Sequence, residues 1–167
     1  MEAGFSLGSN LGERIGWLQQ ARELLLLDPD VRFVGQSSVY ETEPVDVKDE
    51  YMQMKFLNAV LIVDAPYAAE TWLPKIKKVE GELQRVRSAD RNAPRTIDVD
   101  LLFSGDQIVD SDLLTVPHPR WAERRFVLEP LAEVRGDLIL PGQTDPVRNI
   151  LEQMPESDDV RIFAERW

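Results

Sequence analysis

Two aspartates share an apolar stretch in the middle of the chain. Asp98 and Asp100 lie in the run RTIDVDLLFSG, residues 95–105, which is otherwise rich in β-branched and apolar side chains. Side chains alternate between the faces of a strand, so the two carboxylates share one face, about 7 Å apart at the backbone. Burying them without a positive charge between them is costly. Mg²⁺ is the natural candidate, because it prefers carboxylate, water and phosphate oxygens. An exposed strand face with two solvated acids is the alternative.

Arginines gather just before this strand. Arg95 ends the preceding loop, and Arg85, Arg87 and Arg91 lie upstream. Residues 75–95 hold seven Lys or Arg against three acidic residues. Carboxylates beside guanidinium groups suit a nucleoside triphosphate, because a metal bridges phosphate oxygens while arginine forks neutralise charge. The sequence has no GxxxxGK[ST] loop, so side chains must supply the phosphate contacts. Any one of these arginines taken alone could equally form a surface salt bridge.

The bulk composition narrows the functional class. The chain has 167 residues, no Cys and a formal net charge of −11. We expect one domain over residues 1–167 with a real core. The acidic balance argues against nucleic acid as the main partner. Without a long apolar run or a secretory leader, we expect a cytoplasmic protein with no membrane contact. We also expect a monomer.

The periodicity predicts the elements that position these residues. We expect strands at 5–7, 31–44, 56–65 and 95–105, and helices after Asn10 and over 68–87. Asn10 and Glu13 resemble a capping box, and Pro74 either kinks the second helix or marks its first turn. Residues 44–55 form an acidic loop. The C-terminal part predicts a short strand at 107–111, a helix at 120–134 interrupted by Pro130, a strand or turn at 138–142, a helix at 146–154 and a final strand at 158–165.

The order β-α-β-β-α-β at the start of the chain is the ferredoxin-like pattern. We therefore predict an α+β fold, with an antiparallel sheet covered by helices on both faces in three α-β-α layers.

Several motifs occur together in a recognisable order. The run RNAPRTIDVDLL, residues 91–102, closely resembles the hallmark segment of the 6-hydroxymethyl-7,8-dihydropterin pyrophosphokinase family. Further matches are the segments GSN (8–10), FLNAV (56–60) and VPHPR (116–120), with Thr42 and Pro44, and Arg124 followed by FVL (126–128). Each motif is weak alone, but their order over about 120 residues is specific.

The resemblance implies an activity and a set of ATP contacts. Family members transfer the β,γ-pyrophosphoryl group of ATP to the hydroxymethyl oxygen of a reduced pterin and release AMP, in folate biosynthesis. By resemblance, Asp98 and Asp100 hold two Mg²⁺ ions, and Arg85 and Arg95 act on the phosphates. The remaining implied ATP contacts are Lys77, Glu80, Arg87, Ile97, Thr115, His118 and Arg124. His118 is the sole histidine, and it matches a phosphate-binding residue rather than a general base. For Glu80, a salt bridge on the helix surface remains an equal alternative.

The resemblance also implies a pterin site. A flat heterocycle needs aromatic faces and an amide at its edge. Phe56 and Phe126 fit the faces, with core packing as the alternative, and Asn58 fits the edge, because a buried amide on an apolar strand needs a partner. The other implied pterin contacts are Gly8, Thr42, Pro44 and Val45.

The loops at 44–55 and 88–93 are predicted to close over the substrates and exclude water. The chain departs from the family pattern here. Asn92 stands where many members carry an aromatic residue, Gln84 replaces a frequent glycine, and Gly81 falls inside the second helix. The first loop is also longer than in compact members, and it contains Met52 and Met54.

Two other functions remain open at this point. A haloacid-dehalogenase-like phosphatase also uses an apolar-Asp-x-Asp strand, but here Asp100 precedes Leu101 and Leu102 rather than Gly-Thr. A ferredoxin-like ligand-sensing module would explain the strand order but not Arg95 beside two acids.

Overall fold

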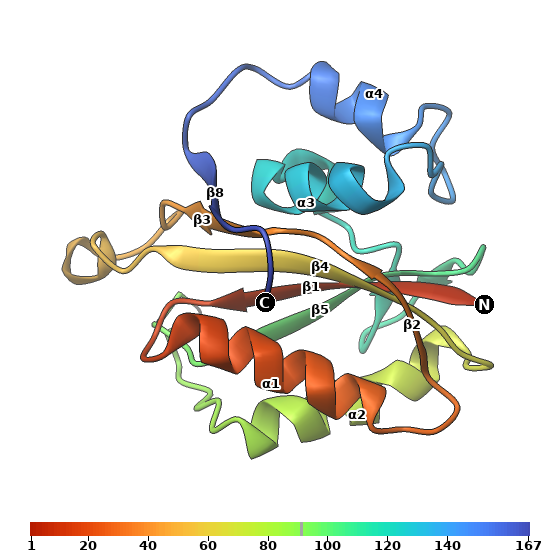
Figure 1. Cartoon of the computed structure of the whole chain (residues 1–167), viewed down its shortest axis with the longest axis horizontal. Helices are drawn as coiled ribbons and strands as arrows, with labels where there is room; N and C mark the ends of the chain where they lie inside the picture. Colours follow the sequence, from red (N-terminus) through yellow and green to blue (C-terminus); the bar gives the residue numbers. More distant parts are fainter. Residues whose placement is uncertain (91) are drawn as a thin grey trace.

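The computed structural model describes residues 1–90 and 92–167 and shows three layers (Figure 1). A central antiparallel sheet separates two pairs of helices, α1 and α2 on one face and α3 and α4 on the other. This confirms the predicted α-β-α arrangement. Arg91, which belongs to the predicted arginine group, lies outside the described residues.

The elements follow the predicted order, with some additions. They are β1 (Glu2–Ser9), α1 (Arg14–Leu26), β2 (Arg32–Gln36), β3 (Val39–Thr42), η1 (Asp49–Tyr51), β4 (Phe56–Asp64), α2 (Ala69–Glu82), β5 (Asp98–Ser104), β6 (Val109–Asp110), β7 (Thr115–Val116), η2 (Trp121–Glu123), α3 (Arg125–Arg135), α4 (Val147–Glu152) and β8 (Val160–Ala164). Among the described residues, no helix is both long enough and apolar enough to cross a membrane.

The sheet has the ferredoxin-like strand order. The described strands run β5-β1-β4-β3-β8, with β2 also paired to β4, and every pairing is antiparallel. Strands β1 and β4 are therefore central, and β5, which carries the two aspartates, is an edge strand. The short β6 and β7 form a separate two-stranded sheet.

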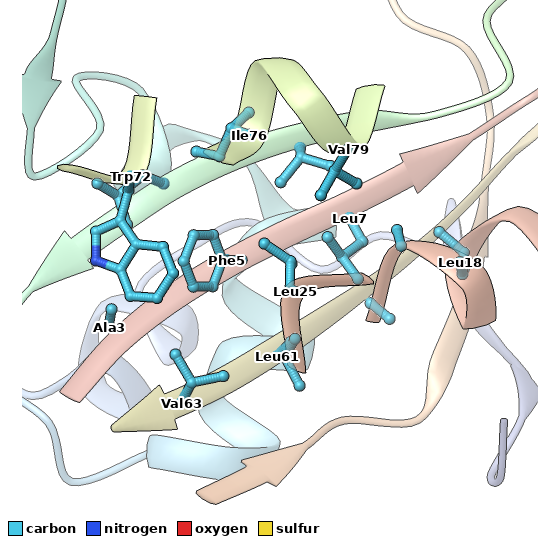
Figure 2. Close-up of a cluster of buried hydrophobic side chains, with 14 of the residues drawn as sticks. Ala3, Phe5, Leu7, Leu18, Leu25, Leu61, Val63, Trp72, Ile76 and Val79 are labelled. Carbon is cyan, nitrogen blue, oxygen red and sulfur yellow. The ribbon is translucent and has the colours of Figure 1, made fainter. Parts of the chain in front are cut away.

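The first core lies between the sheet and helices α1 and α2 (Figure 2). Phe5 of β1 meets Trp72 of α2 in an edge-to-face contact, with ring centroids 4.9 Å apart. Val99 and Leu101 of β5 belong to this core. Because side chains alternate, Asp98 and Asp100 then face the opposite layer, as predicted.

A second core lies under α3 and α4, and a bulge in β5 contributes to it. Leu102 and Phe103 are consecutive, yet both belong to this core. The register shifts between Gly4 and Phe5 of the neighbouring strand, which explains why two successive side chains can share a face. A Cβ atom on Gly4 would lie 2.3 Å from the Phe103 ring, so only glycine fits beneath this aromatic ring.

Several predicted boundaries are wrong. Helix α2 ends at Glu82 rather than near residue 87, and it begins five residues before Pro74, which neither delays it nor ends it. Pro130 does not interrupt its helix either, because it lies buried inside α3. Each proline removes a single backbone donor, and burial of the helix face compensates for that loss.

The predicted strand at 31–44 is two strands. Ser37 lies in the break and bonds Val60 of β4 through its backbone N–H and its hydroxyl, while its carbonyl accepts from the Trp167 indole at 2.7 Å. Because the Ser37 N–H and carbonyl form these hydrogen bonds, they do not take part in a continuous β-ladder over 31–44.

The segment at 138–142 is a turn, and β7 was not predicted.

Candidate active site

Asp98 is held by two arginines at the start of β5. Arg85 donates to its Oδ1 at 2.6 Å, and Arg95 donates to its Oδ2 at 3.1 Å. The side chains of both arginines are only 15% exposed, so these pairs are well shielded from solvent. The structure therefore brings together the predicted carboxylate and the two arginines predicted to act on phosphates.

Glu80 organises the arginines from the neighbouring helix. It lies in the last turn of α2, is only 4% exposed, and accepts the backbone N–H of Val99 at 3.1 Å. Its carboxylate also binds Arg85, and Arg87 donates to it at 3.1 Å. Glu80 therefore forms the salt bridges of that alternative, but it does so as a buried residue rather than on the helix surface.

An open pocket of about 510 Å³ adjoins this cluster. Its lining contains the predicted ATP residues Lys77, Glu80, Arg85 and Arg87, together with Gly81. Sequence reasoning had noted Gly81 only as a helix irregularity. Its missing side chain leaves open space here, since a Cβ atom would meet nothing within 4 Å.

The structure disfavours the charged form of the Asp100 carboxyl group. Burial, followed by the charge of Asp98, raises its pKa from 3.8 to about 7, although Arg124 opposes the shift. The two carboxylates thus repel each other across one face of β5, as expected for groups that await a cation.

His118 follows β7 and is tied to β5. Its backbone N–H donates to the Leu102 carbonyl at 2.9 Å, and its Nδ1 accepts the Arg120 N–H at 3.1 Å. Burial, followed by the charge of Arg124, lowers the pKa of the imidazole. A neutral ring whose Nδ1 accepts carries its proton on Nε2, which can donate to a phosphate oxygen.

The remaining predicted ATP residues are Thr115, Arg124 and Ile97. Thr115 lies half-buried in β7 and Arg124 half-buried before α3. The side chain of Ile97 is fully buried in the first core, just before β5. The nucleotide contact that the family resemblance implies for Ile97 stays a prediction.

The predicted pterin residues gather two strands away from Asp98. Asn58 is 4% exposed, and its Nδ2 donates to the Thr42 hydroxyl at 2.8 Å. Phe56 pairs with Thr42 in the register, and Gly8 pairs with Asn58. The hydrogen bond to Thr42 fixes the orientation of the Asn58 amide.

Gly8 separates the amide from the carboxylate. Its register partners are Asn58 on β4 and Asp98 on β5, so the three residues form one row across the sheet. A Cβ atom on Gly8 would lie 3.0 Å from Asn58 Oδ1. Two strand spacings put Asn58 and Asp98 roughly 10 Å apart at the backbone, a span that a small ligand can bridge.

The other predicted pterin residues lie outside this row, on α3 and in the loop after β3. Phe126 is half-buried at the edge of the second core, and the Arg124 guanidinium lies 5.6 Å from its ring centroid. Pro44 is half-buried, and Val45 is 60% exposed at the start of the loop.

Asn10 has a different role from the predicted cap. Glu13, not Asn10, precedes α1, and it makes no capping hydrogen bond. The Asn10 side chain accepts the Arg95 N–H at 2.8 Å and donates to the Met54 carbonyl at 3.4 Å. It therefore ties Met54 of the first predicted lid loop to Arg95, two residues after the second, a contact that no local sequence signal could reveal.

The carboxylate pair fits Mg²⁺ on its donor chemistry. Among the described residues, no group of three or more His, Cys, Asp or Glu could hold a metal ion. Two carboxylates are nevertheless the usual protein share for Mg²⁺, with water and phosphate oxygens completing the shell. The raised pKa of Asp100 shows that a nearby cation would relieve its repulsion with Asp98.

Comparison with known proteins agrees with this geometry. Residues 4–136 match the family model described as 7,8-dihydro-6-hydroxymethylpterin-pyrophosphokinase. The chain is 38% identical over 161 residues to a Methylorubrum extorquens 2-amino-4-hydroxy-6-hydroxymethyldihydropteridine pyrophosphokinase, covering 96% of this chain and 98% of that protein. It is also 40% identical over 132 residues to the Bacillus subtilis protein of the same name, covering 79% of this chain and 77% of that one.

A longer relative shares the same segment. A Pneumocystis carinii folic acid synthesis protein is 38% identical over 153 residues, covering 92% of this chain but 20% of that protein. This chain thus spans about a fifth of the length of that relative.

Solved structures support the fold. A Plasmodium falciparum HPPK-DHPS crystal structure with pterin and p-hydroxybenzoate has a TM-score of 0.69 at 15% identity, covering 91% of this chain and 42% of that one. The family model and the full-length bacterial relative together establish that this chain belongs to the 7,8-dihydro-6-hydroxymethylpterin-pyrophosphokinase family.

Proposed function

We propose that this protein transfers the β,γ-pyrophosphoryl group of ATP to the hydroxymethyl oxygen of 6-hydroxymethyl-7,8-dihydropterin. The β-phosphorus bond to the oxygen of AMP breaks as the new bond forms, giving AMP, the pterin pyrophosphate and a proton. Family membership supports the reaction, and the row Asn58–Gly8–Asp98 supports the site.

That row is the observation that carries the proposal. An amide suited to the edge of a heterocycle and a carboxylate suited to metal-bound phosphates lie on either side of a residue without a side chain. In-line transfer depends mainly on positioning and charge neutralisation, which this arrangement offers. The pterin would lie over Asn58 and Thr42 between Phe56 and Phe126, while Pro44 and Val45 approach from the loop.

The phosphate side would use the cluster around Asp98. We propose that Arg85 and Arg95 neutralise phosphate oxygens, that His118 donates from Nε2, and that Arg87, Arg124, Lys77 and Thr115 add ATP contacts. Glu80 would hold Arg85 and Arg87 in position, since it already binds both.

We propose that Asp98 and Asp100 bind two Mg²⁺ ions together with the triphosphate. Asp98 and Asp100 would hold the ions beside the triphosphate, where Mg²⁺ would supply positive charge for pyrophosphoryl transfer. Residues 1–167 would act as one domain, monomeric and cytoplasmic.

Product analysis tests the reaction. With ATP, Mg²⁺ and hydroxymethyl-dihydropterin, we expect one AMP per pterin pyrophosphate, and no AMP without the pterin. Release of phosphate from simple monoesters, without AMP formation, would instead favour the phosphatase alternative.

Alanine variants test the carboxylates. Asp98→Ala and Asp100→Ala should abolish turnover and weaken Mg-ATP binding in protein that remains folded by circular dichroism. Near-normal turnover in either variant would refute its proposed metal role.

A further inference from the structure

Two polar contacts join loops that are far apart in the sequence. Lys48 of the 44–55 loop lies 2.7 Å from Asp90, between the Lys48 Nζ and the Asp90 Oδ2. Asn92 Nδ2 donates to the Asp46 carbonyl at 2.6 Å. Each contact links the segment that follows β3 to the segment that precedes β5.

Both ends of this linkage are held by their own segments. The Asp90 Oδ1 accepts the Asn92 N–H at 3.1 Å, and the Ser88 hydroxyl donates to the Asp90 carbonyl at 2.9 Å. Asp46 has a φ of 53°, a left-handed conformation typical of tight turns. The ion pair lowers the pKa of Asp90 and raises that of Lys48, so both groups remain charged at neutral pH.

The same loops are also tied at their bases. Asn10 is 3% exposed and contacts Met54 at the end of one loop and Arg95 at the end of the other. The loops are therefore joined at two levels, through a buried amide at the base and, farther out, through an ion pair between exposed Lys48 and half-buried Asp90.

We propose that Lys48 and Asp90 are positioning residues, whose ion pair holds the 44–55 loop against the loop before β5 and thereby places Pro44 and Val45 at the pterin. This inference rests on the proposed function. The first loop begins at the proposed pterin contacts, and the second ends at Arg95, which binds Asp98. We therefore expect loss of the ion pair to weaken pterin binding more than it slows the reaction.

Asn92 explains why this chain uses a polar contact here. Many family members resembling this chain carry an aromatic side chain at that position, which would cover the pterin by stacking. Asn92 cannot stack in that way, and its amide bonds the opposite loop instead. In this chain, a hydrogen bond between the two loops thus stands where an aromatic ring would stack on the pterin.

Charge reversal tests the inference. Lys48→Glu and Asp90→Lys should each raise the KM for the pterin about three- to tenfold, with kcat and the KM for Mg-ATP changed less than twofold. The double variant, which restores opposite charges, should return the pterin KM to within about threefold of wild type. Lys55→Glu is the matched control, because Lys55 pairs with Glu43 at 2.8 Å within the same loop region and does not reach the second loop.

Hydrogen exchange tests the same ion pair without relying on the activity. In ligand-free protein, amides of both loops should exchange faster in Lys48→Glu and Asp90→Lys, and the double variant should restore protection. The Lys55→Glu control should leave the loop around Asp90 unchanged. Unchanged exchange in both single variants, or a pterin KM that the double variant fails to recover, would overturn the inference. Absence of AMP formation in wild type, with the exchange pattern as expected, would overturn only the proposed function.

Discussion

Asp100 has a strongly raised pKa beside Asp98. A carboxyl whose folded pKa is raised to about 7, against 3.8 normally, costs stability once it ionises. The folded state binds the extra proton, so the contribution of Asp100 to stability falls as pH rises from about 4 to about 7 and stays low above that range.

Asp100→Asn removes this half-buried charge. We expect the variant to be more stable than wild type by roughly 1–3 kcal/mol at pH 8, with the difference vanishing near pH 4. Urea denaturation across this pH range measures the difference. Asp106→Asn, at an exposed turn position, is the control and should show no such trend. A gain that is equal at pH 4 and pH 8 would contradict the shifted pKa.

Asn58 is expected to read the pterin edge. Asn58→Ala should raise the pterin Kd by at least tenfold and change the Mg-ATP Kd less than twofold, because it removes two polar contacts from one ligand only. Thr42→Val should have a smaller effect in the same direction, since it frees the amide that Thr42 now orients. Calorimetric titrations measure both constants, and equal losses for the two ligands would refute this role.

At the scale of elements, α3 is anchored to β3 through Glu133, an exposed acid that binds buried donors. Glu133 accepts the Ser38 N–H at 3.0 Å, the Ser38 hydroxyl at 2.9 Å and the Tyr40 hydroxyl at 2.7 Å. The two elements carry Phe126 and Thr42, so this contact fixes two predicted pterin residues relative to each other.

Glu133→Ala should therefore lower the free energy of unfolding by about 2–4 kcal/mol, because three donors lose their acceptor. Tyr40→Phe removes one of these hydrogen bonds and should cost about 1 kcal/mol. Chemical denaturation compares the two variants. Equal losses would show that the acid does not act as the shared acceptor.

A second prediction at this scale concerns the bulge in β5. Gly4→Ala should destabilise the protein by about 1–3 kcal/mol, because the new methyl group would overlap the Phe103 ring. Gly81→Ala is the matched control. It lies in α2 with open space around it, and it should stabilise the fold by about 0.5–1 kcal/mol. Thermal unfolding separates the two, and a neutral Gly4→Ala would show that Phe103 moves aside freely.

At the scale of the whole molecule, local patterns predicted the layers and the face of the aspartates. Strand alternation alone placed Asp98 and Asp100 opposite Val99 and Leu101, and the element order predicted the ferredoxin-like sheet. These properties depend on neighbouring residues, which the sequence displays directly.

Contacts between distant segments could not be predicted in this way. Asn10 resembled a cap because Glu13 follows three residues later, but its amide serves Met54 and Arg95. Glu80 looked like a surface residue until α2 packed its last turn against β5. Such roles depend on residues that are neighbours only in the folded protein. The family resemblance suggested a role for Glu80, but it suggested none for Lys48 and Asp90.

We propose above all that Asp98 and Asp100 hold metal-bound triphosphate on the strand next to Gly8 and two strands from Asn58. A crystal structure with a non-hydrolysable ATP analogue, hydroxymethyl-dihydropterin and Mn²⁺ in place of Mg²⁺ tests it most directly. The account predicts anomalous scattering peaks beside both carboxylates, with phosphate oxygens on the metal and the pterin against Asn58. Metal and phosphates bound elsewhere, with the two carboxylates facing only solvent, would contradict it.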